Sequence, residues 1–441
     1  MNGNQRKRWL GLGLVLMVCL LGISAPFQHF AAFPNELRLF SGQLKQLDYV
    51  MPVHAQVTVD PHILQVNGST NHSISVDLNK PLSLQSNFSG ETTMKLKLFG
   101  RIPFKTVKVN VVPDLRVIPG GQTIGVKVKS AGIMVVGHHQ VIHANGKKIS
   151  PGELAKLQLG DLIVKINGQY INEVHKVARI AEEAGAAKQP IKLTVKRGSE
   201  FFETKLSPVF DSEDKAWRLG LYIRDSAAGV GTLTFFAPDQ GVYGALGHVI
   251  TDMDTQTAIE VGEGQILQSN VTSINKSQSG EPGEKRAHFI KESKVLGNIE
   301  RNTPFGIFGK MNELPAHSYK DQSIPVAFAE EVKEGPAQLL TVVNGQKVER
   351  FDVQIVHVTH QSSPATKGMV IKITDPRLLQ QTGGIVQGMS GSPIIQDGKL
   401  VGAVTHVFVN DPSSGYGCFI EWMLQDAGIL LKQDKENLKA A

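Results

Sequence analysis

Residues 388–393 read Gly-Met-Ser-Gly-Ser-Pro, and an apolar run follows them. The glycines on either side of Ser390 allow a tight turn whose backbone N–H groups converge on one point. An oxyanion hole requires that convergence, and we expect the N–H groups of Gly388 and Ser390 to form it. The hexapeptide therefore predicts that Ser390 is a nucleophile presented on a turn before a strand.

A general base and a carboxylate precede this turn in the chain. Gly247-His248-Val249 supplies the candidate base, and Asp375 stands 390 − 375 = 15 residues before Ser390. A serine hydroxyl needs a neutral imidazole to accept its proton, and the imidazole needs a group that holds its tautomer. The order His, Asp, Ser is that of chymotrypsin-like peptidases. We therefore expect a serine endopeptidase with His248, Asp375 and Ser390 as its catalytic residues.

The residues leave alternatives open at two of these positions. Ser390 competes with Ser392, and either serine fits an ordinary turn. Asp375 precedes a proline, where Asp commonly initiates a turn. It also lies closer in sequence to the serine than to the histidine, which reverses the usual chymotrypsin-like spacing. Asp252 and Asp254 are rival carboxylates for the third catalytic position.

The segment from residue 210 to the end reads mostly β. Asp397-Gly398 is a favoured hairpin turn between the apolar runs 393–396 and 400–407. In chymotrypsin-like enzymes the strand after the nucleophile turn lines the main chain of the substrate. We therefore expect residues 401–407 to do so, with Thr405 or His406 near the first specificity pocket.

Residues 119–209 alternate strand and helix signals. Residues 157–168 read Leu-Gln-Leu-Gly-Asp-Leu-Ile-Val-Lys-Ile-Asn-Gly, and this stretch strongly resembles the core of bacterial PDZ domains. The resemblance implies a groove between a strand at 133–136 and a long helix at 172–184, where a peptide adds as an extra strand. The loop before that strand would then offer N–H groups to a carboxylate. The predicted peptide-binding residues are Ser130, Ala131, Gly132, Ile133, Met134 and Val135.

The N-terminal quarter predicts a targeting segment and a small domain. Arg6, Lys7 and Arg8 precede an uncharged apolar run from Trp9 to Ile23. Such a run fits the hydrophobic region of a secretory signal, and we expect residues 1–30 to be a signal anchor that leaves the bulk of the chain outside the cytoplasm. Polar and apolar residues alternate from 46 to 118, which predicts a small β-domain.

Composition limits the remaining classes of function. The chain has 441 residues, 44 glycines, two cysteines and a net charge of +6 that is spread along its length. It contains no phosphate-binding loop, and the histidines at 138, 139 and 143 lack Cys or carboxylate partners at a suitable spacing. We expect no cofactor, no metal and no nucleic-acid partner. A binding protein with an inactive peptidase fold, or an esterase, remains as an alternative, although a PDZ domain argues against the esterase.

Several of these features together resemble the stage IV sporulation protein B peptidases of endospore-forming bacteria. They are the signal anchor, the PDZ domain, Gly-His-Val-Ile-Thr-Asp at 247–252 and Gly-Gly-Ile-Val-Gln-Gly-Met-Ser-Gly-Ser-Pro at 383–393. The resemblance implies a mainly β protein: signal anchor, small β-domain, PDZ domain and, from residue 210 to 441, a chymotrypsin-like β-barrel peptidase. The resemblance also implies that His248 is the general base, Ser390 the nucleophile and Asp375 the third catalytic residue.

The resemblance also implies a biological setting. The protein would be made in the forespore, exported to the space between the two membranes and anchored until it cleaves itself near its N-terminus. It would then cleave the extracytoplasmic part of a membrane complex that inhibits an intramembrane metalloprotease. That metalloprotease would process the precursor of the late mother-cell sigma factor. The PDZ domain would bind a peptide, either to restrain the enzyme or to tether it to its target.

Overall fold

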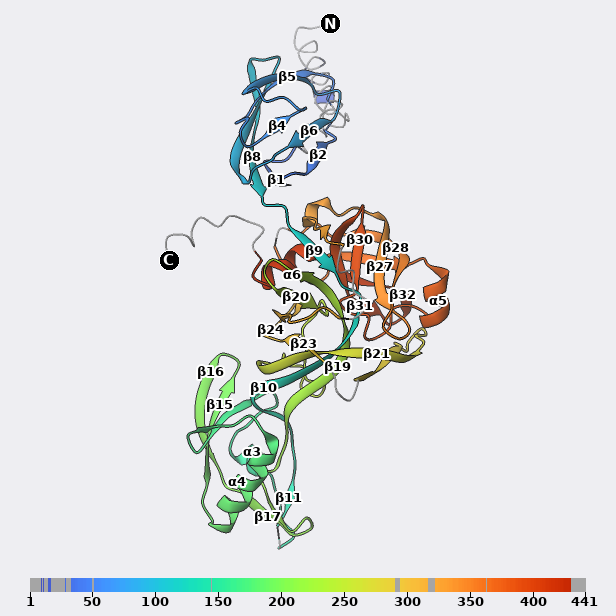
Figure 1. The fold of residues 1–441 in the computed structure, drawn as a ribbon. Coiled ribbons are helices and arrows are strands. Elements are labelled where there is room, and N and C mark those ends of the chain that lie inside the picture. The colour runs from blue at the N-terminus through green and yellow to red at the C-terminus, as the bar shows by residue number, and fades with distance from the viewer. Residues whose placement is uncertain are drawn as a thin grey trace. The chain divides into compact units, whose positions relative to one another are not determined.

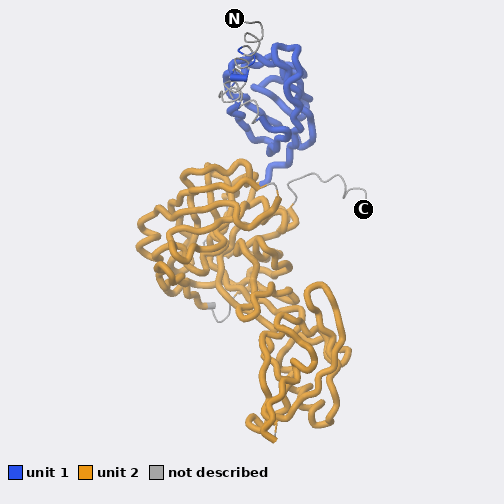
Figure 2. The backbone as a smooth tube through the Cα atoms, turned by 180° about the vertical axis from the view of Figure 1, so that it is seen from behind, with its two compact units in different colours: residues 1–115, 430–441 blue, residues 116–429 orange. Residues whose placement is uncertain are grey.

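The computed structural model of the chain describes residues 33–429 except 50, 144, 290–293, 316–321 and 362, together with a few single positions before residue 33. The predicted signal anchor at 1–30 thus lies almost entirely outside the described residues. Within the described part, no helix is long and apolar enough to cross a membrane. The chain divides into two compact units, residues 1–115 with 430–441 and residues 116–429 (Figure 2).

The first unit consists of a five-stranded and a three-stranded sheet. In order, the five-stranded sheet contains β1 (Glu36–Phe40), β8 (Ile102–Val112), β7 (Gly90–Leu98), β3 (His54–Thr58) and β5 (Ser73–Asp77). The three-stranded sheet contains β2 (Leu44–Leu47), β6 (Leu82–Gln85) and β4 (Gln65–Val66).

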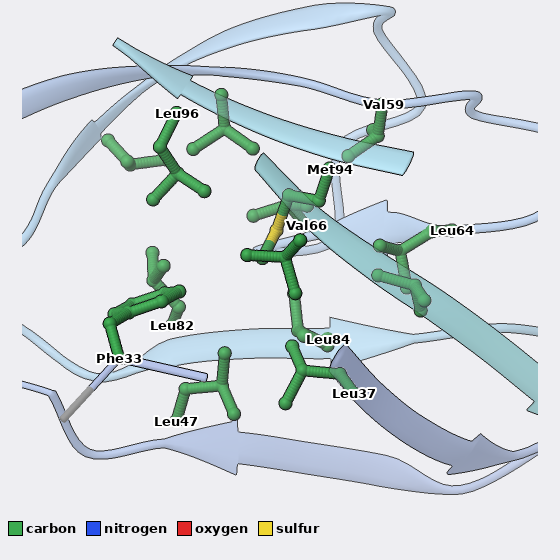
Figure 3. Close-up of a cluster of buried hydrophobic side chains, with 14 of the residues drawn as sticks. Phe33, Leu37, Leu47, Val59, Leu64, Val66, Leu82, Leu84, Met94 and Leu96 are labelled. Carbon is green, nitrogen blue, oxygen red and sulfur yellow. The ribbon is translucent and has the colours of Figure 1, made fainter. Parts of the chain in front are cut away.

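Period-two alternation gives this unit its core. Val107, Val109 and Val111 on β8 are buried, because alternate residues of a strand point to the same face. Apolar side chains of both sheets, including Leu84 and Met94, meet in one cluster (Figure 3). Strands β1 and β2 extend this unit to residues before the predicted domain start at 46.

In the second unit, two long strands run from the region of the predicted PDZ domain into the region of the predicted peptidase domain (Figure 1). They are β10 (Thr123–His138) and β19 (Leu221–Ala237), which pair with each other along much of their length. Between them in sequence lie the elements of the predicted PDZ domain. These are β11 (Val141–Ile142), β12 (Lys148–Ile149), α3 (Pro151–Leu154), β13 (Leu162–Ile166), β14 (Gln169–Tyr170), α4 (Val174–Ala186), β15 (Ile191–Arg197), β16 (Glu200–Leu206), β17 (Val209–Asp211) and β18 (Ala216–Arg218).

The PDZ elements are therefore an insertion in a larger sheet. The end of β10 pairs with β13, whereas its beginning, from Ile124 to Ser130, pairs with β21 (Val261–Asn275). The predicted PDZ domain spans residues 119–209. Strands β10 and β19, which flank its elements, each continue from them into the larger sheet.

The peptidase part consists of a half-barrel sheet and a closed barrel. Around β10, β19 and β21 the sheet continues in β9 (Arg116–Pro119), β20 (Val242–Ala245), β22 (Glu284–Phe289), β23 (Val295–Asn298), β24 (Arg301–Thr303), β25 (Gly306–Lys310) and β26 (Ile324–Pro325). A short 3-10 helix, η1 (Ala329–Glu331), leads to the barrel.

The closed barrel follows the order β27 (Gly335–Val342), β28 (Val348–Val358), β29 (Met369–Ile373), β32 (Asp411–Phe419), β31 (Lys399–Phe408) and β30 (Pro393–Gln396), with helices α5 (Pro376–Thr382) and α6 (Ile420–Asp426) beside it. Asp397 and Gly398 both have positive φ, as the predicted β30–β31 hairpin turn requires. The prediction of a mainly β chain with a barrel of the kind found in chymotrypsin-like peptidases is confirmed.

One glycine of α4 allows a close contact between the helix and β18. Gly185 lies inside the helix, since α4 continues to Ala186. A Cβ at Gly185 would lie 2.1 Å from Cδ2 of Trp217. The glycine is required there because the indole of β18 packs directly on the helix backbone.

Candidate active site

The serine turn connects α5 to β30 and is held by strand β19. Gly388 and Gly391 both have φ +91°, and a Cβ on Gly391 would lie 2.2 Å from the carbonyl oxygen of Thr232. The Thr232 hydroxyl donates to the Gly388 carbonyl at 2.7 Å, and its N–H donates to the Ser390 carbonyl at 3.0 Å. The turn is therefore fixed from one side by the half-barrel sheet.

Along the turn, backbone N–H groups that donate a hydrogen bond alternate with N–H groups that do not. Met389 N–H donates to the Val386 carbonyl at 3.0 Å, and Gly391 N–H donates to the Val404 carbonyl at 2.8 Å. The N–H groups of Gly388 and Ser390 have no hydrogen-bond partner among the described residues. These two are the predicted oxyanion donors.

His248 follows a strained stretch of backbone. Leu246 and Gly247 have φ of +72° and +70°, a conformation that non-glycine residues adopt at a cost and that often marks functional sites. Gly247 packs so closely on β31 that a Cβ would lie 3.0 Å from the Val404 carbonyl oxygen. This tight approach sets the imidazole beside β31.

The hydrogen bond of His248 determines its tautomer. Nδ1 lies 2.8 Å from the carbonyl oxygen of Val249. A carbonyl only accepts, so Nδ1 carries the proton and Nε2 of the neutral ring keeps its lone pair. Burial lowers the pKa of His248, and the hydrogen bond to Val249 partly opposes that shift. The ring is thus neutral at pH 7, as a general base must be.

His248 and Ser390 both lie against the same segment of β31. Ser390 Oγ donates to the Thr405 carbonyl at 3.0 Å, and Gly247 lies against the Thr405 side chain. The rings of His248 and His406 are 5.5 Å apart between centroids. In this resting arrangement the serine hydroxyl is bound to a backbone carbonyl and not to the imidazole. Catalytic hydrogen bonds often form only once substrate is bound.

The two residues predicted near the specificity pocket differ in exposure. Thr405 is buried, and its hydroxyl donates to the Tyr416 carbonyl at 3.2 Å. His406, the next residue, is exposed beside His248. Of the pair, His406 is therefore the one that a substrate can touch directly.

The expected role of Asp375 needs correction. Its carboxylate accepts from the backbone N–H of Arg377 at 2.9 Å, capping α5, and forms an ion pair with the Arg377 guanidinium at 2.7 Å. It also accepts from Asp352 N–H at 3.3 Å. The Arg377 hydrogen bond is the main reason that the pKa of Asp375 is lowered. No described contact joins Asp375 to His248, so the turn-initiating role of Asp before Pro is the one observed.

The rival carboxylates are also engaged elsewhere. Asp252 is buried and forms an ion pair with Arg224, whose other nitrogen lies 2.7 Å from Asp254. Asp252 further accepts from Asp254 N–H and Thr255 N–H at 3.0 Å. Among the described residues, no carboxylate contacts His248, and its orienting partner is the Val249 carbonyl.

The predicted peptide-binding strand lies inside a sheet. Ile133 and Met134 pair with β13 on one side, and Met134 and Val135 pair with Arg224 and Ile223 of β19 on the other. The preceding loop is also occupied, since Ser130 pairs with β21 and Ala131 N–H donates to the Glu260 carbonyl. A peptide cannot add to a strand whose edges are both paired, so the assignment of residues 130–135 to peptide binding is wrong.

The unpaired strand edge next to α4 belongs to the start of β19. From Leu221 to Asp225 the strand pairs only with β10 among the described residues. Leu221 and Ile223 are half-buried and pack on the same cluster as α4, and the Asp225 carboxylate accepts from Val174 N–H at the start of α4 at 2.9 Å. The free edge of β19 at residues 221–225, next to the start of α4, therefore replaces residues 130–135 as the candidate place for a peptide to add as a strand.

Two further residues near the serine turn were missed by sequence reasoning. Lys285 on β22 and Thr341 on β27 are buried, and Lys285 Nζ lies 2.7 Å from the Thr341 hydroxyl. Nothing in the local sequence distinguishes Lys285 from a solvated strand residue, because its burial comes from elements far along the chain. In the described part of the chain, no cluster of three or more His, Cys, Asp or Glu side chains is arranged to hold a metal ion.

Comparison with known proteins agrees with this architecture. Residues 215–424 match the family described as SpoIVB peptidase S55, and residues 144–197 match the PDZ domain family. No curated protein matches the chain. The active form of the Rv3671c protease from M. tuberculosis is similar at 15% identity and a TM-score of 0.26, over 46% of this chain and 75% of that one. Its inactive form gives 15% and 0.24, over 45% and 84%. Likenesses at these scores are too weak to carry an argument about this chain.

Proposed function

Because this chain carries the peptidase domain of the SpoIVB S55 family and a PDZ domain, it is a serine endopeptidase, and we propose that Ser390 is its nucleophile and His248 its general base. The observation that carries this assignment is the free pair of N–H groups at Gly388 and Ser390, beside an imidazole whose Nε2 is left unprotonated.

The reaction follows from these contacts. When substrate enters, the Ser390 hydroxyl leaves the Thr405 carbonyl and gives its proton to His248 Nε2 as Oγ attacks the scissile carbonyl carbon. The Gly388 and Ser390 N–H groups donate to the oxygen that becomes negative. His248 then protonates the leaving amine, and a water activated by the same ring hydrolyses the acyl-enzyme.

A backbone carbonyl takes the place of the usual carboxylate in this proposal. The Val249 carbonyl, 2.8 Å from Nδ1, fixes the tautomer and accepts from the imidazolium when it forms. A neutral carbonyl stabilises that cation less than a carboxylate does. Asp375 then acts at a distance from the chemistry, as the cap of α5.

The finer biological assignment rests on the family resemblance. We propose that the chain is exported across the forespore membrane, is anchored by residues 1–30 and cleaves itself near its N-terminus. It then cleaves the extracytoplasmic part of the membrane complex that inhibits the sigma-factor-processing metalloprotease. A peptide from one of these protein partners is proposed to occupy the groove between α4 and residues 221–225, whose free strand edge supports that placement.

The peptidase assignment is tested with the purified full chain in detergent. Wild type and Ser390→Ala are incubated with a serine-directed fluorophosphonate probe, and new N-termini are sequenced. Labelling of residue 390 and new N-termini in the wild type alone support the proposal. A fully folded wild type that is neither labelled nor cleaved would favour the alternative, a PDZ-based binding protein with an inactive peptidase fold.

The sporulation role needs a test in cells. In an endospore-forming bacterium that lacks its own copy, the wild-type chain should restore processing of the late sigma-factor precursor, and Ser390→Ala should not. Restoration by Ser390→Ala would place the function in binding. Failure of an active wild type would show that its targets lie outside this pathway.

A further inference from the structure

Lys285 is a buried lysine that packs against the serine turn. Its relative exposure is 1%, and no carboxylate lies within ion-pair distance of it among the described residues. Its ammonium nitrogen Nζ donates a hydrogen bond to the Thr341 hydroxyl at 2.7 Å. Burial lowers the pKa of Lys285 to about 7.

Lys285 contacts the turn along most of its length. Its N–H donates to the Gln387 carbonyl at 2.9 Å, which fixes the residue before Gly388. Its aliphatic stem lies against Gly388, since a Cβ there would be 3.1 Å from Lys285 Cβ and 3.5 Å from its Cδ. At the far end of the turn, the Ser392 hydroxyl lies 3.2 Å from the Thr341 hydroxyl that Lys285 binds.

This arrangement is an expensive way to stabilise a fold. A buried ammonium without a counter-ion loses its hydration, and one hydroxyl replaces only part of it. An apolar side chain of similar length would fill the same space without that loss. The contribution of Lys285 must therefore be sought in the conformation of the turn that it touches.

Lys285 is not placed to react with substrate itself. Lys285, Thr341 and Ser392 are all buried, whereas Ser390 and Gly388 are partly exposed. A residue that supports reacting groups from behind acts by holding their geometry. Catalysis is sensitive to that geometry, because misplacement by about 1 Å can lower a rate about 100-fold.

We propose that Lys285 is a positioning residue of the peptidase, which with Thr341 holds the turn 387–392 in the conformation that leaves the N–H groups of Gly388 and Ser390 free. The backbone bond to Gln387 fixes the entry to the turn, and the chain from Nζ through Thr341 to Ser392 fixes its exit. Without this support the peptide between Gln387 and Gly388 is free to rotate and to turn the Gly388 N–H away from the substrate. The inference rests on the proposed role of Ser390 and names a residue that supports it.

Variants of the full chain separate positioning from a merely structural role. Lys285→Met keeps the volume and removes the charge, Thr341→Val removes the hydroxyl, and Thr341→Ser keeps it. Lys276→Met, at an exposed lysine just after β21, is the control. The readouts are kcat and KM on a cleaved peptide, and the thermal midpoint of unfolding.

The proposal predicts a specific combination of results. Lys285→Met lowers kcat by ~10- to 100-fold with KM within about threefold of the wild-type value, and its thermal midpoint stays equal or rises. Thr341→Val behaves in the same way, and Thr341→Ser and Lys276→Met resemble the wild type. The double variant Lys285→Met with Thr341→Val loses no more than either single variant, because both act through one network.

Other results overturn the proposal. Wild-type kcat in folded Lys285→Met, or a lower thermal midpoint with unchanged kcat per folded molecule, leaves Lys285 with a structural role only. If Lys285→Met does not fold, equal kcat values for Thr341→Val and Thr341→Ser decide against positioning. An inactive, unlabelled wild type instead refutes the proposed function itself, and that result is read from the wild type before any variant is compared.

Discussion

The serine turn and the proposed peptide groove are built in different ways, although strand β19 contributes to both. The turn takes its shape from consecutive residues, with φ +91° at Gly388 and Gly391. The groove instead depends on residues 221–225, which return to the PDZ sheet beside Met134 and Val135 long after that strand has ended. A local motif thus identifies the first site, and only long-range strand pairing identifies the second.

Strand β19 joins the two sites physically. It borders α4 at its start, and Thr232 near its end donates to the Gly388 carbonyl. At the start of the strand, Arg224 forms an ion pair with Asp252, which stands four residues after His248. The two sites can therefore be compared by substituting a residue at one of them and measuring both catalysis and peptide binding.

The largest expected effect comes from the catalytic pair. Ser390→Ala or His248→Ala should lower kcat by roughly 10⁴- to 10⁶-fold. The first removes the nucleophile, and the second removes the base that accepts the proton of the nucleophile. Peptide binding in the groove should stay unchanged, since both residues lie in the peptidase part. Steady-state kinetics with a fluorescent peptide and binding measured by anisotropy check the two halves of this prediction. Loss of peptide binding in either variant would mean that the groove includes the catalytic site.

A smaller effect is expected at the oxyanion hole. Gly388→Ala should lower kcat by about 10²- to 10³-fold, the cost of one lost oxyanion donor. Residue 388 has a positive φ, and the new Cβ would lie 3.1 Å from Lys285 Cβ, so the turn must shift. Gly398→Ala is a matched control, with φ +77° and nothing within 4 Å of its Cβ. Both substitutions should cost a similar amount of stability, measured by denaturant unfolding. Equal kcat values for the two variants would contradict the role of Gly388.

The sequence allowed some of these features to be predicted and not others. The roles of Ser390 and His248 were predicted from local chemistry and stay predictions, and the hairpin turn at Asp397-Gly398 is confirmed by its positive φ angles. Asp375 was misassigned because an Asp before Pro caps a helix as readily as it serves a histidine, and sequence order alone does not show which arginine or imidazole it faces. The groove was misassigned because β13 and β19 occupy both edges of the expected strand. Lys285 gave no signal, since its burial is produced by tertiary packing.

The next largest effect is expected on peptide affinity, from a substitution in the proposed groove. Ile223→Ser should weaken binding of a peptide selected on the wild-type chain by about tenfold, because truncating a half-buried Ile removes about 1 to 2 kcal/mol of apolar contact. Phe201→Ser, on the exposed face of β16, is the control. Calorimetry measures both affinities. Unchanged affinity in Ile223→Ser would show that the peptide binds elsewhere.

The smallest expected effect is a displacement along the pH axis. Burial lowers the pKa of His248 below its ordinary value of 6.5, and only the neutral ring accepts the serine proton. The acid limb of kcat/KM should therefore have its midpoint below pH 6.5, with activity rising as pH rises through it. Stability should also decline below pH 6.5, since the unfolded chain then binds a proton that the folded ring resists. The pH profile of kcat/KM is measured for both the wild type and Lys285→Met, because the variant lacks the lysine and shows the titration of His248 without it. A midpoint above pH 7 in both would contradict the assignment.

The most direct test of the account is kcat/KM of Asp375→Asn at pH 7.5, because the account assigns catalysis to Ser390 and His248 without that carboxylate. Asparagine still caps α5, so we expect kcat/KM within about tenfold of the wild-type value, with a modest loss of stability from the weakened Arg377 contact. A folded variant that loses about 10⁴-fold, as expected when the carboxylate partner of a catalytic histidine is replaced by its amide, would contradict the account and return Asp375 to the catalytic site.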